Sequence, residues 1–257
     1  MKNINPYFLL AFAAILAFSS CSKDKDVIPD PATKNILVSR SVTGTGAVSR
    51  YNRDNTGRLL SYIQSEGTKA KDSIALTYDA SGNISMMRWL IYSAAAKNEY
   101  TYDAKGKLIT RLGYTTDGKA SSTGTFTYYE DRYEELRTYI DNSTNKYVYF
   151  YTPDKKNIAE FKLYGTSGKV AEESTYTYGN IKALRFGYEQ AAGFSNQNMA
   201  EKTVTTTYNN SVPGSIPVTV TSFRKMVANA DGYPTSIEYS ASNSTTTSTT
   251  VYEYIVK

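Results

Sequence analysis

A heptapeptide pattern that recurs along the 257-residue chain constrains its fold more than any other feature. Tyr78–Ile84 (YDASGNI) and Tyr102–Leu108 (YDAKGKL) share the form Tyr-Asp-x-x-Gly-x-aliphatic. Glycine readily adopts the positive φ that a tight hairpin turn needs, and tyrosine and isoleucine favour strands. Each copy therefore predicts a strand, a tight turn and a second strand.

Looser copies of this pattern follow tyrosines along most of the chain. The tyrosines that precede a turn are Tyr51, Tyr78, Tyr102, Tyr128, Tyr151, Tyr178 and Tyr208. Their successive gaps are 27, 24, 26, 23, 27 and 30 residues, so one repeat is one hairpin plus one return loop. Turn residues such as Asp117-Gly118 recur between the tyrosines, so we expect tight turns at one end of the sheet and looser turns at the other.

Side chains of opposite character alternate within the predicted strands, as the two faces of a sheet require. Within residues 132–140, Leu136 and Ile140 share one face, and Glu135 and Arg137 share the other. The segment from residue 36 to residue 256 holds about 14 to 17 such strands, and an open sheet of that length must curl or close. We therefore predict an all-β fold in which residues 35–257 form a single domain. It is an antiparallel up-and-down meander of tandem hairpins, closing into a barrel or a strongly curled sheet.

The first 34 residues read as an export signal followed by a tether. Tyr7–Phe18 is an unbroken apolar run, too short to span a bilayer but suited to a signal peptide. The ending Phe18-Ser19-Ser20-Cys21 resembles the lipobox of bacterial lipoproteins, with phenylalanine where leucine is more usual. This resemblance implies a signal peptide over residues 1–20 and lipidation of Cys21. An ordinary secretory signal with an incidental cysteine is the alternative.

Residues 21–34 are then the lipidated cysteine and a flexible tether, because the stretch is charged, contains two prolines and lacks periodicity. Asp24 and Asp26 resemble the surface-export signal of Bacteroidetes lipoproteins, and a plain solvated linker explains them equally well. The predicted location is the outer membrane, lipid-anchored, on the cell surface or the periplasmic face.

Composition excludes several kinds of chemistry. The chain has no histidine and Cys21 is its single cysteine, which removes Ser-His and Cys-His nucleophile pairs, disulfides within the chain and thiolate metal sites. We predict no enzymatic activity, no cofactor and no metal. The net charge is +5, but lysine and arginine alternate with acidic residues, so no basic block indicates a nucleic-acid partner.

Two carboxylate pairs leave a hydrolase as an alternative function. Glu134-Glu135 and Glu172-Glu173 are neighbours in sequence, so on a strand the two members of each pair point to opposite faces. Neither pair can flank a glycosidic bond by itself. A carboxylate-dependent hydrolase would need a pair drawn from distant strands.

The lipobox, the charged tether and the tyrosine-rich hairpins together resemble a Bacteroidetes lipoprotein family of unknown function described as having a porin-like β-fold. The turns also resemble the YD (Rhs-type) repeats of large bacterial secreted shells. The family resemblance implies a large antiparallel meander barrel. It implies no activity, and no catalytic residue can be carried over from it.

Aromatic residues are the candidate ligand contacts, because tyrosine and tryptophan stack on sugar rings while offering a polar tip. The chain has 24 tyrosines and one tryptophan. The candidates are Trp89, Tyr100, Tyr102, Tyr128, Tyr149, Tyr151, Tyr176 and Tyr178. The alternative is that these rings fill a half-buried sheet face, above all Trp89, which lies in the most apolar predicted strand.

These features predict a lipid-anchored binding or scaffold protein of the cell envelope. Its expected partners are the membrane, through the lipid, and a glycan or an envelope protein. A membrane-spanning, pore-like barrel is the second hypothesis, because tyrosines aligned beside the turns resemble an aromatic girdle. Charged residues such as Glu160 and Lys162, which interrupt the apolar faces, argue against spanning.

Overall fold

A computed structural model describes residues 36–66, 69–91, 94–184, 194, 196–212 and 214–256. The predicted signal peptide, Cys21 and the tether lie outside these residues. Residues 35–257 form one compact unit. Within the described part of the chain, no helix is long and apolar enough to cross a membrane.

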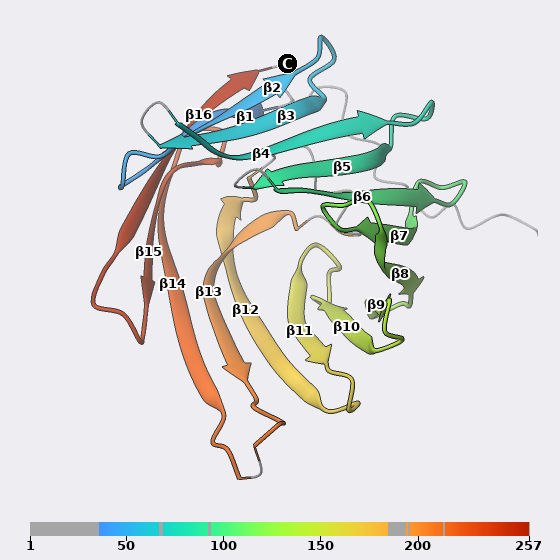
Figure 1. Cartoon of the computed structure of the whole chain (residues 1–257). Helices are drawn as coiled ribbons and strands as arrows, with labels where there is room; N and C mark the ends of the chain where they lie inside the picture. The colour runs from blue at the N-terminus through green and yellow to red at the C-terminus, as the bar shows by residue number, and fades with distance from the viewer. Residues whose placement is uncertain are drawn as a thin grey trace, which may run out of the picture. The chain divides into compact units, whose positions relative to one another are not determined.

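Sixteen strands form a closed barrel in which each strand pairs antiparallel with its neighbours in sequence (Figure 1). They are β1 (Ile36–Thr43), β2 (Val48–Arg53), β3 (Leu59–Glu66), β4 (Lys69–Tyr78), β5 (Ile84–Ile91), β6 (Ala94–Tyr102), β7 (Leu108–Tyr114), β8 (Ala120–Tyr128), β9 (Arg132–Tyr139), β10 (Thr144–Tyr151), β11 (Ile158–Tyr164), β12 (Val170–Lys182), β13 (Asn198–Thr207), β14 (Val218–Ala228), β15 (Pro234–Ala241) and β16 (Ser248–Val256). The last strand closes the barrel on the first, with Ser41 opposite Tyr252. The predicted all-β antiparallel meander and its closure are confirmed.

The repeated heptapeptide forms one kind of turn, held by its aspartate. The Asp79 carboxylate accepts hydrogen bonds from the backbone N–H groups of Ser81 and Asn83, both at 2.9 Å, and Gly82 has a φ of +85°. These backbone hydrogen bonds hold the pKa of Asp79 below its usual range. Asp54 and Asp103 make the corresponding pairs of backbone hydrogen bonds in their own turns.

At the opposite end, where we expected looser turns, the connections after β7 and β11 have the same tight geometry, whereas those after β13 and β15 are longer, over residues 208–217 and 242–247. In residues 115–119, Thr115 N–H donates to the Lys119 carbonyl at 2.9 Å and Gly118 has a φ of +81°. Gly168 ends a similar turn with a φ of +72°. A threonine or glycine therefore replaces the aspartate at the first turn position without changing the hairpin.

Replacing Gly82 with alanine should destabilise the barrel through backbone strain alone. A Cβ atom built on Gly82 meets no atom within 4 Å, but a left-handed φ costs a residue with a side chain about 1–2 kcal/mol. Equilibrium urea unfolding measures the loss. Gly165→Ala is the matched control, since its Cβ would lie 3.8 Å from the Ala171 side chain, an ordinary contact. Equal stability of the two variants would contradict the prediction.

The hydrophobic core lies inside the barrel near one end. We call this the core end; it carries the turns that follow β2, β4, β6, β8, β10 and β14. The buried residues of the core are Leu59, Leu76, Ile84, Met87, Tyr100, Leu108, Phe126, Tyr133 and Ile158 in one cluster and Val38, Leu184, Ile237 and Tyr252 in a second. With the partly buried side chains that pack on them, the two clusters draw on all sixteen strands. The opposite end is called the polar end below.

Tyrosines beside the turns join neighbouring strands at the core end. The Tyr78 hydroxyl donates to the carbonyl of Leu59 at 2.7 Å, and that of Tyr128 donates to the carbonyl of Leu108 at 3.0 Å. Tyr178 donates to Ile158 in the same way, at 2.7 Å, and Tyr254 donates to Pro234. Each acceptor is the first residue of the adjacent strand. At Tyr78, Tyr128 and Tyr178, a half-buried phenol that satisfies a strand-end carbonyl gives a reason for tyrosine before the turn.

Candidate binding site in the barrel interior

The side chains that β9 points into the barrel change from apolar to polar along the strand. Tyr133, Glu135, Arg137 and Tyr139 occupy alternate positions from the core end toward the polar end and share the inner face. Tyr133 belongs to the apolar core. The next three are polar, so the interior changes from apolar to polar within half of one strand.

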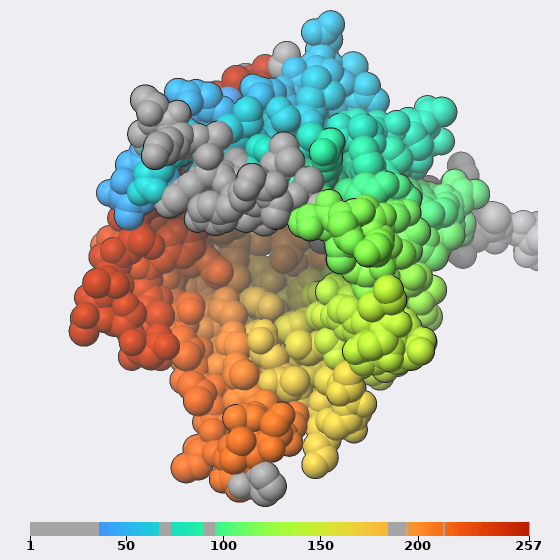
Figure 2. Space-filling view, viewed as in Figure 1, coloured from blue at the N-terminus to red at the C-terminus, as the bar shows by residue number. Residues whose placement is uncertain are grey.

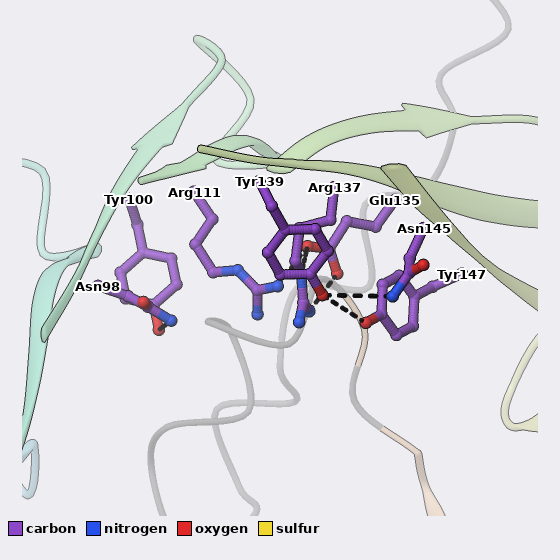
Figure 3. Close-up of polar contacts among 8 residues, drawn as sticks. All are labelled: Asn98, Tyr100, Arg111, Glu135, Arg137, Tyr139, Asn145 and Tyr147. Atoms are coloured by element: carbon purple, nitrogen blue, oxygen red, sulfur yellow. Dashed lines mark hydrogen bonds and ion pairs between the residues drawn. The ribbon is translucent and has the colours of Figure 1, made fainter. Parts of the chain in front are cut away.

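Glu135 is the centre of a buried ion cluster (Figure 3). Glu135 is only 3% exposed to solvent. Its carboxylate pairs with Arg111 from β7 and with Arg137, whose Nε and Nη2 atoms lie 3.1 and 3.2 Å from the two carboxylate oxygens. Two guanidinium groups thus share one carboxylate, which leaves one positive charge in excess inside the barrel wall.

Glycine creates the space for this cluster. On β8, Gly124 lies opposite both Arg111 and Arg137, and a Cβ atom there would come within 2.5 Å of the Glu135 carboxylate. On β7, a Cβ at Gly113 would lie 2.7 Å from the Ser122 hydroxyl. Because Gly124 has no side chain, Arg111 and Glu135 meet across the intervening strand.

A group of phenols and amides lies beside the cluster on the polar side. The hydroxyl of Tyr139 is 3.4 Å from that of Tyr147 and accepts a hydrogen bond of 3.4 Å from the Asn145 amide (Figure 3). The Arg137 guanidinium lies 4.4 Å from the centre of the Tyr147 ring. Burial favours the neutral phenol of Tyr139, but the Tyr147 hydrogen bond and the Arg137 charge outweigh it, so the pKa of Tyr139 is below its ordinary value.

Another inward arginine lies on the opposite wall of the barrel. Arg224 on β14 donates through Nη1 to the Ala200 carbonyl at 3.0 Å and to the Thr203 hydroxyl at 3.3 Å. It lines a cavity of about 330 Å³ together with Tyr239 and several serine and threonine residues from β14 to β16. Among the described residues, no carboxylate lies within ion-pair distance of Arg224. Figure 2 shows that the molecule is hollowed between β13 and β14, drawn in orange, and the strands drawn in green.

The predicted ligand-contact aromatics face this interior. Tyr100 is part of the buried core, and the other candidates pack against it: Trp89, Tyr102, Tyr128, Tyr149, Tyr151, Tyr176 and Tyr178, the last through its contact with Tyr176. The rings of Tyr133 and Tyr149 stack with centroids 4.5 Å apart. These rings are gathered in one interior region.

Sequence reasoning missed Arg111, Arg137 and Glu135 as site residues. The expected alternation of β9 is present, and Glu134 and Glu135 point to opposite faces as predicted. A usable signal was the separation of 24 residues between Arg111 and Glu135, about one repeat, which places the two residues on the strands that flank β8. Among the described residues, no group of acidic or thiol side chains is placed to hold a metal ion.

The outer face of the barrel carries ion pairs around its circumference. Arg40 on β1 pairs with Glu253 on β16, and Lys97 pairs with Glu99 on β6 at 2.7 Å. On β11, Lys162 lies 2.9 Å from Glu160. Exposed aliphatic and aromatic side chains such as those of Leu136 and Phe223 are interspersed with these charges.

The fold is that of the porin-like β-barrels. A porin-like protein from Bacteroides uniformis superposes with a TM-score of 0.53 at 16% identity, covering 86% of this chain and 95% of the other. A porin-like protein from Bacteroides vulgatus superposes with a TM-score of 0.52 at 12% identity, covering 85% and 99%. At these identities the likeness concerns the fold alone.

Sequence comparisons add no family. No protein-family model matches the chain, and no curated protein matches it. A Tc toxin complex, TcdB2-TccC3-TEV, aligns over 15% of its own length with a TM-score of 0.27, so the relation to YD repeats stays a prediction. The predicted lipoprotein nature of the chain likewise stays a prediction.

Proposed function

We propose that this chain is a non-enzymatic binding protein of the cell envelope, tethered by a lipid on Cys21, whose barrel does not span the membrane. The observation that carries the proposal is the distribution of charge on the outer face. A lysine or arginine on the lipid side of a barrel costs about 2–4 kcal/mol at the bilayer midplane. The pairs on β1–β16, β6 and β11 would place several such groups in lipid.

The side chains inside the barrel favour a binding cup rather than a pore. Every strand contributes a side chain to the apolar clusters at the core end. Leu184 and Phe194, from the connection between β12 and β13, also pack into these clusters. Leu184 belongs to the second cluster, and Phe194 packs on the first, with its ring centre 5.0 Å from that of Tyr151. In this proposal, packing of these apolar side chains closes the core end, and the polar interior is reached from the other end.

The carboxylates support binding over hydrolysis. Glycoside hydrolysis uses two carboxyl groups about 5–10 Å apart, one of which must be available as an acid or a nucleophile. Glu135 is held by two arginines, and Glu173 on the outer face accepts a hydrogen bond from the Tyr208 hydroxyl at 2.5 Å. Both are engaged in structural contacts. A glycan or an envelope protein is therefore bound and released unchanged in this proposal.

Fractionation of a lipid-free protein tests the tether and the barrel together. The variant carries Cys21→Ala behind a signal peptide that is cleaved without lipid addition, and the wild-type chain is its control. We expect the wild type to sediment with membranes and the variant to be soluble after a carbonate wash. A variant that still extracts as an integral membrane protein would overturn the proposal in favour of a spanning barrel.

A further inference from the structure

We propose that the cluster of Arg111, Glu135 and Arg137 is a binding site for an oxyanion carried on a hydroxyl-rich molecule, such as an acidic or sulfated saccharide. The proposal deepens the proposed function by naming a ligand class, and it rests on that function only in treating the protein as a binder. Binding to the purified chain can be measured whether or not the barrel spans a membrane, so the two proposals fail separately.

Charge is the first argument. The side chains of Arg111, Arg137 and Glu135 are 18%, 23% and 4% exposed, so the one excess positive charge is largely removed from water. A buried charge without a counterion is unfavourable, and an anion in the adjacent space would relieve it. Among the described residues, Glu172 is another inward carboxylate, and it lies on β12 opposite Leu163, three strands away from Glu135.

Hydrogen-bond donors are the second argument. Each guanidinium has five N–H donors in a planar fork suited to carboxylate, sulfate or phosphate. Glu135 takes Nη2 of Arg111 and Nε and Nη2 of Arg137, so donors of both groups remain. The carboxylate fixes the two guanidiniums in place before a ligand arrives, which lowers the entropy that binding must overcome.

The residues around the arginines could recognise the hydroxyl groups of the ligand. Tyr139, Asn145 and Tyr147 lie on one side of the arginines, and Asn98 and Tyr100 from β6 lie on the other (Figure 3). Phenols and amides both donate and accept hydrogen bonds, as sugar hydroxyls require, and the rings offer faces for stacking. The missing side chain of Gly124 leaves the space that the Glu135 carboxylate occupies, which holds the cluster at this place on the inner face.

Isothermal titration calorimetry on the full chain in a polyoxyethylene detergent tests the site. The probes are trigalacturonate, its uncharged methyl ester, a sulfated trisaccharide, and inorganic sulfate and phosphate. We expect binding of trigalacturonate or the sulfated trisaccharide at low ionic strength, and at least about tenfold weaker binding of the uncharged ester, because one charged hydrogen bond contributes about that factor.

Three variants identify the residues. Arg111→Gln should weaken binding of the anionic saccharide by about tenfold or more, and Arg111→Lys should restore part of it, because lysine keeps the charge without the fork. Arg50→Gln removes the same charge from the exposed outer face of β2 and should leave binding unchanged. Circular dichroism confirms that each variant is folded.

Three results would overturn the inference: no binding of either anionic saccharide to the wild type, equal affinity for the uncharged ester, or unchanged affinity in Arg111→Gln. Binding of inorganic sulfate or phosphate without either saccharide would overturn the hydroxyl-rich part, and the site would then be one for a free inorganic anion.

Discussion

Replacing Glu135 with glutamine is expected to lower the free energy of unfolding by about 3 kcal/mol, because it leaves two largely buried arginines without a counterion. The side chain keeps its shape and an amide oxygen, so the loss reflects charge and not a cavity. Arg111 and Arg137 both depend on this one carboxylate. Equilibrium urea unfolding, followed by far-UV circular dichroism, measures the effect.

Glu134→Gln is the matched control, because it makes the same change one residue away on the outer face of the same strand. Glu134 pairs with Arg132 at 2.9 Å, and ion pairs at the surface contribute about 0–1 kcal/mol. We expect the control to unfold close to the wild type. A Glu135→Gln protein as stable as the control would mean that the interior charges are compensated by water and not by the carboxylate.

The inner face of β9 shows why the site was not predicted. The alternation of residues 132–140 is visible in the sequence, but an ordinary reading would turn the aliphatic side chains inward. In the structure Leu136 and Ile140 are 46% and 77% exposed, and Glu135 is buried. The inward face is set by pairing with β8, where Gly124 makes room for the carboxylate, and a single strand carries no record of that partner.

The hairpins could be predicted, because each turn is determined by residues that are close together in the sequence. In Tyr102–Leu108, the Asp103 side chain and the positive φ of Gly106 fix the turn within five residues. Closure of the barrel depends on pairing β1 with β16, from the two ends of the domain. Sequence reasoning reached closure only through the strand count, which requires a long meander to curl or close.

The division of the interior follows from the same repeat. Tyrosines before the turns and aliphatic residues after them fall at the core end on strand after strand, as with Tyr78 and Ile84. Positions two and four residues further along the strands carry no such constraint from the turn. They are free to hold arginine, glutamate, asparagine and tyrosine, so the repeat builds an apolar end and leaves the side chains toward the polar end free to vary.

Replacing Tyr133 with alanine is expected to destabilise the barrel by about 3–5 kcal/mol, the usual cost of deleting a large buried ring. Tyr133 is 3% exposed, stacks on Tyr149 and lies 5.8 Å from the ring centre of Tyr128 and 6.4 Å from that of Phe194. Its removal opens a cavity among aromatic rings that rigid strands cannot close. The loss should be accompanied by a weaker near-UV circular dichroism signal, because the neighbouring tyrosines lose their fixed packing.

Tyr129→Ala tests whether the effect comes from burial or from losing any tyrosine in this region. Tyr129 is 44% exposed, and its main contact is the Arg132 guanidinium 4.1 Å from the ring centre, an interaction that contributes about 0.5–1 kcal/mol at exposed sites. Tyr133→Phe keeps the ring and should retain most of the stability. If Tyr133→Ala cost no more than Tyr129→Ala, the core end would be loosely packed, and a barrel closed at that end, on which the binding-cup proposal depends, would have to be abandoned.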